Sequence, residues 1–243
     1  MIDATFIIIV AGSFVASVFN AAFSAGGALI ILAITSTVLP IQAIVPIHST
    51  LLIGSTVTRI IFFWDFIDWR LVRSFLVGSL VGAFVGARIY VELPEAIIAT
   101  AISVVMLVAI WLPEMSWRPR LRHPWIIVGF IHSLFSTLFA YGALLHAVVL
   151  HANLERRQII GTLGGCLAGM SIFKITGYAY YGFDYSPYYA VIAAAIAVSF
   201  LGTAVGKMIV DRLSEERFRL VYRALITLSA LRLLYTGLLE GRA

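Results

Sequence analysis

Small hydroxyl side chains occur inside two apolar segments of this 243-residue chain, at Ser49-Thr50 and at Gly161-Thr162. His48 comes directly before the first of these pairs. A serine or threonine hydroxyl can donate a hydrogen bond to an oxyanion. In hydrocarbon the same hydroxyls also join neighbouring helices, so the residue types alone leave both interpretations open.

Two long basic side chains, Arg59 and Lys174, lie well inside apolar segments. A charge at that depth in a bilayer is costly and usually marks a substrate or ion pathway. In that case the two cations would attract an anion from opposite sides of the membrane. The alternative is that each stem lies along apolar surface and brings its charged head to the nearer interface.

A short apolar segment near the N-terminus follows a cluster of polar and glycine residues. A helix from Gly26 to Leu39 rises only about 21 Å, less than the roughly 30 Å of bilayer hydrocarbon. It would begin inside the membrane, where its free amides favour an anion. A glycine kink that satisfies only local backbone is the alternative. The cluster is Asn20, Ser24, Gly26 and Gly27, and Tyr141 and Gly142 stand at the corresponding place in the second half.

The other reactive side chains form no catalytic or metal-binding pattern. Four histidines suit proton relay or pairing with an anion, but no two have metal-ligand spacing with a third partner. They are His48, His132, His146 and His151. Cys166 is the single cysteine, and no HExxH, GxSxG or paired-carboxylate site occurs. We therefore predict that the protein is not an enzyme and uses no metal or cofactor.

The composition is that of a polytopic membrane protein. Hydrophobic residues make up 61% of the chain and charged residues 12%, and the mean hydropathy is +1.01. The net charge of +5 comes from basic residues in short loops, which indicates membrane topology and not nucleic acid. The predicted partners are the lipid bilayer and a small anionic substrate, and a homo-oligomer is left open.

Ten apolar runs divide the chain, and two of them are short. They cover about residues 4–22, 26–39, 46–64, 71–91, 96–112, 124–139, 142–151, 158–181, 187–208 and 218–239. Ten crossings fit the loops as well as eight crossings with two re-entrant hairpins. Placing the arginine-rich loops in the cytoplasm puts both termini outside. Six tyrosines are expected in an outer interfacial belt: Tyr178, Tyr180, Tyr181, Tyr185, Tyr188 and Tyr189.

The chain also carries an internal repeat. GAFVGARIYVELPE, from Gly82, matches GTAVGKMIVDRLSE, from Gly202, without a gap. Each half holds five apolar runs, an odd number, so the halves enter the membrane from opposite sides. We predict an all-α integral membrane protein of two inverted-topology repeats, each of about five helical segments, including short broken or re-entrant helices. The repeats cover residues 1–112 and 124–243, with a cytoplasmic linker at 113–123.

Glycines recur at every fourth position in three of the apolar runs. Such seams of small residues let helix backbones approach closely in lipid, so we predict that they pack helices together. They are Gly78, Gly82 and Gly86, then Gly161, Gly165 and Gly169, and then Gly202 and Gly206.

Four stretches carry a resemblance to a known family. They are GGALIILAITSTVLP from Gly26, VPIHSTLLIGSTVTR ending at Arg59, FIDWR from Phe66 and VGAFVGARIYVELPE from Val81. With these stretches the sequence resembles the TauE/SafE sulfite exporter family of bacterial membrane permeases, over essentially the whole chain. The resemblance implies movement of sulfur-containing anions across the inner membrane, usually outward.

We therefore predict an alternating-access permease that exports sulfite, thiosulfate, sulfoacetate or similar organosulfonates. A transporter of another small anion or of a neutral solute, and a proton-coupled anion importer, stay open. The predicted substrate site lies between the repeats. Its residues are Asn20, Ser24, Gly26, Gly27, His48, Ser49, Thr50, Arg59, Tyr141, Gly142, Gly161, Thr162 and Lys174.

Overall fold

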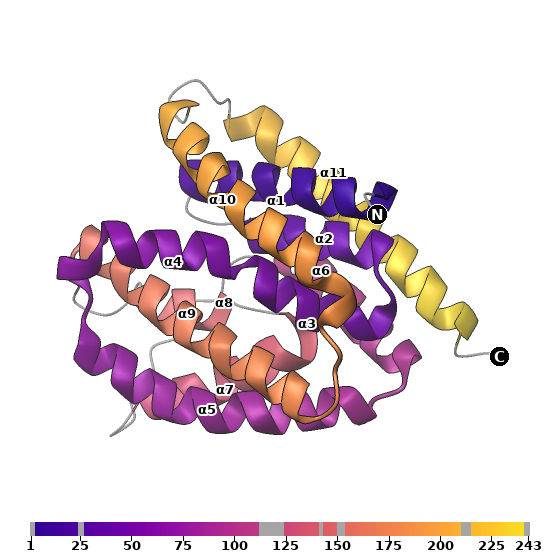
Figure 1. Ribbon diagram of the computed structural model, residues 1–243, viewed down its shortest axis with the longest axis horizontal. Helices are drawn as coiled ribbons and strands as arrows, with labels where there is room; N and C mark the ends of the chain where they lie inside the picture. Colours follow the sequence, from indigo (N-terminus) through magenta and orange to yellow (C-terminus); the bar gives the residue numbers. More distant parts are fainter. Residues whose placement is uncertain are drawn as a thin grey trace. The chain divides into compact units, whose positions relative to one another are not determined.

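The computed structural model contains helices and no strands in the residues that it describes, which are 3–23, 27–111, 124–140, 143–149, 154–209 and 215–240 (Figure 1). The all-α prediction is thereby confirmed. Five segments are long and apolar enough to cross a membrane: Ala4–Ala21, Ile41–Phe62, Trp69–Glu92, Arg157–Tyr180 and Ser186–Gly206. The linker predicted at 113–123 lies outside the described residues.

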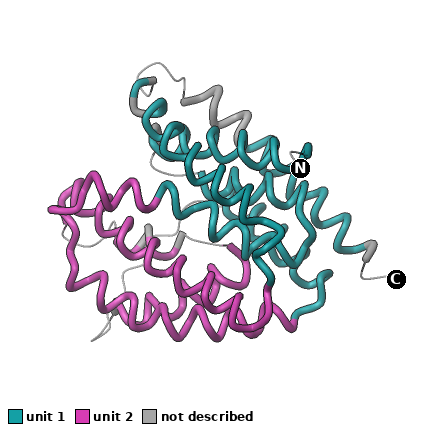
Figure 2. Tube along the Cα trace, in the orientation of Figure 1, with its two compact units in different colours: residues 1–55, 93–112, 184–243 teal, residues 56–92, 113–183 magenta. Residues whose placement is uncertain are grey.

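Two compact units make up the chain (Figure 2). Unit 1 covers residues 1–55, 93–112 and 184–243, and unit 2 covers residues 56–92 and 113–183. Each unit therefore combines helices from both halves of the sequence, so the units are not the two repeats, which stay a prediction.

Each predicted apolar run contains a helix. The helices of unit 1 are α1 (Ala4–Phe23), α2 (Gly27–Val38), α3 (Ile41–Leu51), α6 (Glu95–Trp111), α10 (Tyr189–Ile209) and α11 (Glu215–Glu240). Those of unit 2 are α5 (Trp69–Glu92), α7 (Pro124–Phe139), α8 (Ala143–Val149) and α9 (Arg156–Tyr180). Helix α4 (Ile53–Phe62) begins at the end of unit 1 and lies mostly in unit 2.

The run expected at 46–64 differs from its prediction, because its helix starts earlier and is interrupted. Helix α3 begins at Ile41, contains Pro46 and ends at Leu51, and only Leu52 separates it from α4. Hydroxyls beside the interruption bond to nearby carbonyls of their own segment: Thr50 donates to Ile47 at 2.7 Å and Ser55 donates to Leu52 at 3.1 Å. Such local bonds compete with the helical ladder and bend helices.

A glycine seam holds α5 against α7 in unit 2. A Cβ atom at Gly78 would overlap the carbonyl oxygen of Ile126, and one at Gly82 would overlap that of Phe130. At Gly86 it would lie 2.9 Å from Cβ of Thr137. The predicted packing role is confirmed, since only glycine allows the two backbones to come this close.

Helices α10 and α1 meet through an equivalent seam in unit 1. A Cβ atom at Gly202 would lie 2.6 Å from the Phe14 carbonyl oxygen, and one at Gly206 would overlap the carbonyl oxygen of Val18. In unit 2, Gly82 contacts Phe130 and Gly86 contacts Leu134, four residues later. In unit 1, Gly202 contacts Phe14 and Gly206 contacts Val18, which is also four residues later. The matching register favours the internal repeat.

We predict that Gly78→Val destabilises the protein by about 1–3 kcal/mol or more, because overpacking against a backbone carbonyl cannot be relieved by a rotamer change. The measurement is the thermal unfolding midpoint in detergent. Val81→Ala, at an exposed position of the same helix, is the control and should leave the midpoint nearly unchanged. Equal midpoints for Gly78→Val and the control would contradict the seam.

Candidate functional site

Lys174 is a fully buried cation in unit 2, with 2% of its surface exposed. Its Nζ atom donates to the carbonyl oxygen of Ser136 at 2.8 Å and lies 3.2 Å from the Ser136 Oγ atom, to which it also donates. The side chain thus points from α9 into the last turn of α7. Of the two interpretations of Lys174, the structure supports the buried charge and not the side chain that extends to an interface.

The end of α7 explains this position. The carbonyl groups of a last helical turn lack intrahelical donors and carry partial negative charge, so they favour a cation. Helix α7 ends at Phe139, and Ala140 takes a positive φ of 56° while its amide donates to Ser136 at 3.0 Å. The Ser136 carbonyl therefore accepts from both a backbone amide and the lysine.

A second α9 side chain holds the same turn. The hydroxyl of Tyr178 donates to the Thr137 carbonyl, and its ring packs edge-on against Tyr90 of α5 with centroids 5.4 Å apart. Tyr178 is completely buried, so its predicted place in an outer interfacial belt is wrong. Tyr185 is also buried, whereas Tyr180 and Tyr189 are exposed as such a belt requires.

Lys174 has no carboxylate partner in the described part of the chain. The ion pair that the structure does describe joins Arg88 and Glu92 on the exposed side of α5, at 3.6 Å. Two oxygens of Ser136 accept hydrogen bonds from Nζ, but no described carboxylate compensates a positive charge on it. An uncompensated buried charge is unfavourable, so binding of an anion next to Lys174, at the end of α7, would be favourable.

Arg59 lies at a different level of unit 2. A Cβ atom at Gly164 would lie 2.9 Å from the Cβ atom of Arg59, so α4 and α9 touch there. Lys174 follows Gly164 by ten positions, which is about 15 Å along a helix. Arg59 therefore meets α9 at a position separate from that of Lys174.

Gly161 and Thr162 anchor the segment before α5 and do not approach Lys174. The Asp68 amide donates to the Thr162 hydroxyl at 3.0 Å, and the Asp68 carboxylate accepts from the Leu71 amide at 3.1 Å. A Cβ atom at Gly161 would lie 2.8 Å from the carbonyl oxygen of Phe63. Both predicted site residues thus have a structural explanation.

In unit 1 the predicted residues make mostly local contacts. Ser49 donates to Val45 of its own helix at 2.8 Å, and Thr50 does the same to Ile47, so neither hydroxyl joins a neighbouring helix in this structure. His48 differs, because its Nε2 atom donates to the Ala28 carbonyl of α2 at 3.0 Å.

Helix α2 begins close against α1. A Cβ atom at Gly27 would meet the Ala16 carbonyl and would lie 2.8 Å from Cβ of Asn20, so glycine is needed for this approach. The helix begins and ends within one residue of its predicted bounds. Four predicted site residues, Ser24, Gly26, Tyr141 and Gly142, lie outside the described residues.

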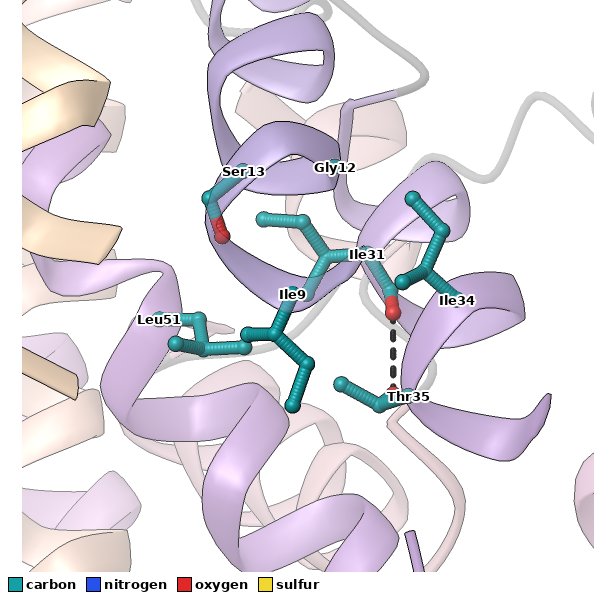
Figure 3. Close-up of a pocket in the computed structure, with 7 residues that line it drawn as sticks. All are labelled: Ile9, Gly12, Ser13, Ile31, Ile34, Thr35 and Leu51. Carbon is teal, nitrogen blue, oxygen red and sulfur yellow. Dashed lines mark hydrogen bonds between the residues drawn. The ribbon is translucent and has the colours of Figure 1, made fainter. Parts of the chain in front are cut away.

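A narrow crevice in unit 1 offers no second site (Figure 3). Its lining is apolar apart from two hydroxyls, of which Thr35 donates to Ile31 at 2.9 Å and Ser13 has no partner among the described residues. The crevice has no room for a water molecule, so we assign it no ligand. Its other lining residues are Ile9, Gly12, Ile34 and Leu51.

Ser136 was not among the predicted site residues, although the predicted repeat contains a signal for it. FVASVFNAAF in α1 and FIHSLFSTLF in α7 align through the glycine contacts described above, which places Ser136 opposite Asn20. Asn20 was singled out because it precedes a glycine pair. The residue aligned with Asn20 in the second half of the predicted repeat is Ser136.

His132 was predicted to suit proton relay or pairing with an anion, and in the structure its ring holds the start of a short helix. Its Nδ1 atom accepts from the Leu145 amide at 3.2 Å, in the first turn of α8. Amides of a first turn have no intrahelical acceptor. The ring also packs beside Phe75, with centroids 5.8 Å apart.

We predict that His132→Phe lowers the thermal unfolding midpoint more than His132→Asn does. Phenylalanine leaves the buried Leu145 amide unsatisfied, at a cost of about 1–3 kcal/mol, whereas the asparagine side-chain oxygen can replace Nδ1 as the acceptor. Unfolding of both variants in detergent provides the comparison. A midpoint for His132→Asn as low as that for His132→Phe would show that ring packing, and not the hydrogen bond, holds α8.

A comparison with protein families adds one finding to this geometry. The family model described as Sulfite exporter TauE/SafE matches residues 9–233, which is nearly the whole chain. The matched range includes Lys174, Ser136 and the glycine seams of both units. No curated protein and no solved structure matches the chain.

Proposed function

Because the chain belongs to the sulfite exporter TauE/SafE family, we propose that it is a membrane permease for sulfur-containing anions. The proposed substrates are sulfite, thiosulfate, sulfoacetate or similar organosulfonates. The proposed location is the inner membrane, with several spans and both termini outside. The five long apolar segments support the multi-pass arrangement.

The observation that carries the proposal is the buried ammonium of Lys174. A positive charge that is shielded from water and not neutralised by its own protein can bind an anion within a permease. Lys174 meets both conditions in the described part of unit 2, since it is buried and has only the two Ser136 oxygens as partners. Arg59, about 15 Å away along α9, is assigned a second attracting position on the same path.

Export is the proposed direction. One elementary charge crossing 100 mV is worth about 2.3 kcal/mol, so an inside-negative membrane expels a monoanion without a coupling ion. Uptake of a dianion would oppose about 4.6 kcal/mol per 100 mV and would need coupling to protons or sodium. The simpler mechanism is passive, potential-driven export by alternating access of the two predicted repeats.

We predict that Lys174→Met abolishes potential-driven efflux of sulfite and thiosulfate from liposomes that contain the purified protein. Methionine keeps much of the side-chain volume but removes the charge that attracts the anion. Arg88→Gln, which removes one positive charge from an exposed position of α5, is the matched control and should transport normally.

The unfolding midpoint of Lys174→Met should not fall below that of the native protein, because replacing a buried unpaired charge by an apolar side chain is often neutral or stabilising. Normal efflux by Lys174→Met would remove Lys174 from the site. Absence of anion efflux in the native protein, with transport of a neutral solute, would overturn the anion proposal itself.

A further inference from the structure

The Ser136 side chain has hydrogen-bonding capacity that no described contact uses. Its Oγ atom accepts from Lys174, but the structure describes no bond in which the Ser136 hydroxyl donates its own proton. Two buried serines on other described helices do donate: Ser103 bonds to Ala99 at 2.7 Å and Ser199 to Ala195 at 2.8 Å. Ser136 differs from these two because its Oγ atom accepts from a buried lysine of another helix.

The Lys174 ammonium also has one N–H donor that the described contacts do not use. A lysine Nζ carries three N–H donors, and the described contacts of Lys174 use two of them, both on oxygens of Ser136. Among the described residues, one N–H and one O–H, on atoms 3.2 Å apart, are therefore without an acceptor at the end of α7. Two adjacent donors of this kind can bind one oxyanion group.

Among the described contacts at the end of α7, Lys174 supplies the one positive charge. Arg59 of α4 contacts α9 at Gly164, ten positions and about 15 Å along the helix from Lys174. The nearby Tyr178 hydroxyl is committed to the Thr137 carbonyl and adds no charge. One negative charge on the ligand neutralises the lysine, whereas a second charge on the same sulfur centre would remain buried and unpaired.

We propose that Ser136 and Lys174 form a two-donor subsite that binds an oxyanion group with one negative charge, such as a sulfonate or hydrogensulfite. Dianions with both charges on one group, such as sulfate and thiosulfate, bind more weakly there, and sulfite binds as hydrogensulfite. The inference rests on the proposed permease function and specifies which part of the substrate the site binds. Sulfoacetate would bind through its sulfonate group, with its carboxylate directed away from Lys174.

The experiment measures binding of methanesulfonate and of sulfate to the purified full-length protein in detergent, by isothermal titration calorimetry at constant ionic strength. The variants are Ser136→Ala, Lys174→Met and, as a matched control, Ser103→Ala, which removes a buried serine hydroxyl of unit 1. Ser136→Ala keeps the backbone carbonyl that holds Lys174, so it tests the hydroxyl alone.

We expect the native protein to bind methanesulfonate at least about tenfold more tightly than sulfate. Ser136→Ala should weaken methanesulfonate binding by about tenfold to a hundredfold, the usual effect of losing a hydrogen bond to a charged group. Ser103→Ala should bind like the native protein, and Lys174→Met should bind neither anion.

Two results would overturn the subsite while leaving the permease proposal intact: native-like methanesulfonate affinity in Ser136→Ala, or equal affinity of the native protein for both anions. If the native protein neither binds methanesulfonate nor transports any sulfur anion in liposomes, the proposed function fails together with the subsite. Liposome efflux by the native protein therefore separates the two failures.

Discussion

The contact between the Lys174 ammonium and the last carbonyls of α7 is the interaction on which the proposed chemistry of unit 2 depends. A helix end buried in apolar surroundings needs donors, and a buried ammonium needs acceptors. Each satisfies the hydrogen bonds of the other through the Ser136 carbonyl. A carbonyl supplies only partial negative charge, however, so the lysine keeps most of its attraction for an anion.

This contact requires that α7 and α9 be held by the same neighbour. Helix α5 packs against α7 through Gly78, Gly82 and Gly86, and it meets α9 where a Cβ atom at Gly177 would lie 3.1 Å from Cβ of Ala87. Tyr90 of α5 fixes the Tyr178 ring, whose hydroxyl bonds the same turn of α7. Close packing in lipid relies on small residues and van der Waals contact, since lipid tails are as apolar as the side chains.

The helices themselves could be predicted closely. The bounds of α2 were expected at 26–39 and are found at Gly27–Val38, since hydropathy and glycine position both mark them. The helix expected to begin at 46 starts at Ile41, because Pro46 was taken as a boundary while the structure accommodates it within α3. Tyr178 was assigned to a surface belt because six tyrosines cluster in sequence, but the packing of α5 and α9 encloses this one.

The candidate site could be predicted only in part. The sequence alone determined which segments are helical and that Lys174 lies deep within one of them, because backbone groups in hydrocarbon must be satisfied within the segment and charges there are rare. Only the tertiary structure decided that the lysine turns toward Ser136 while the hydroxyls of Ser49 and Thr162 are used elsewhere. A lysine stem is long and flexible and a hydroxyl rotates freely, so their partners depend on which helix end the packing brings within about 3 Å.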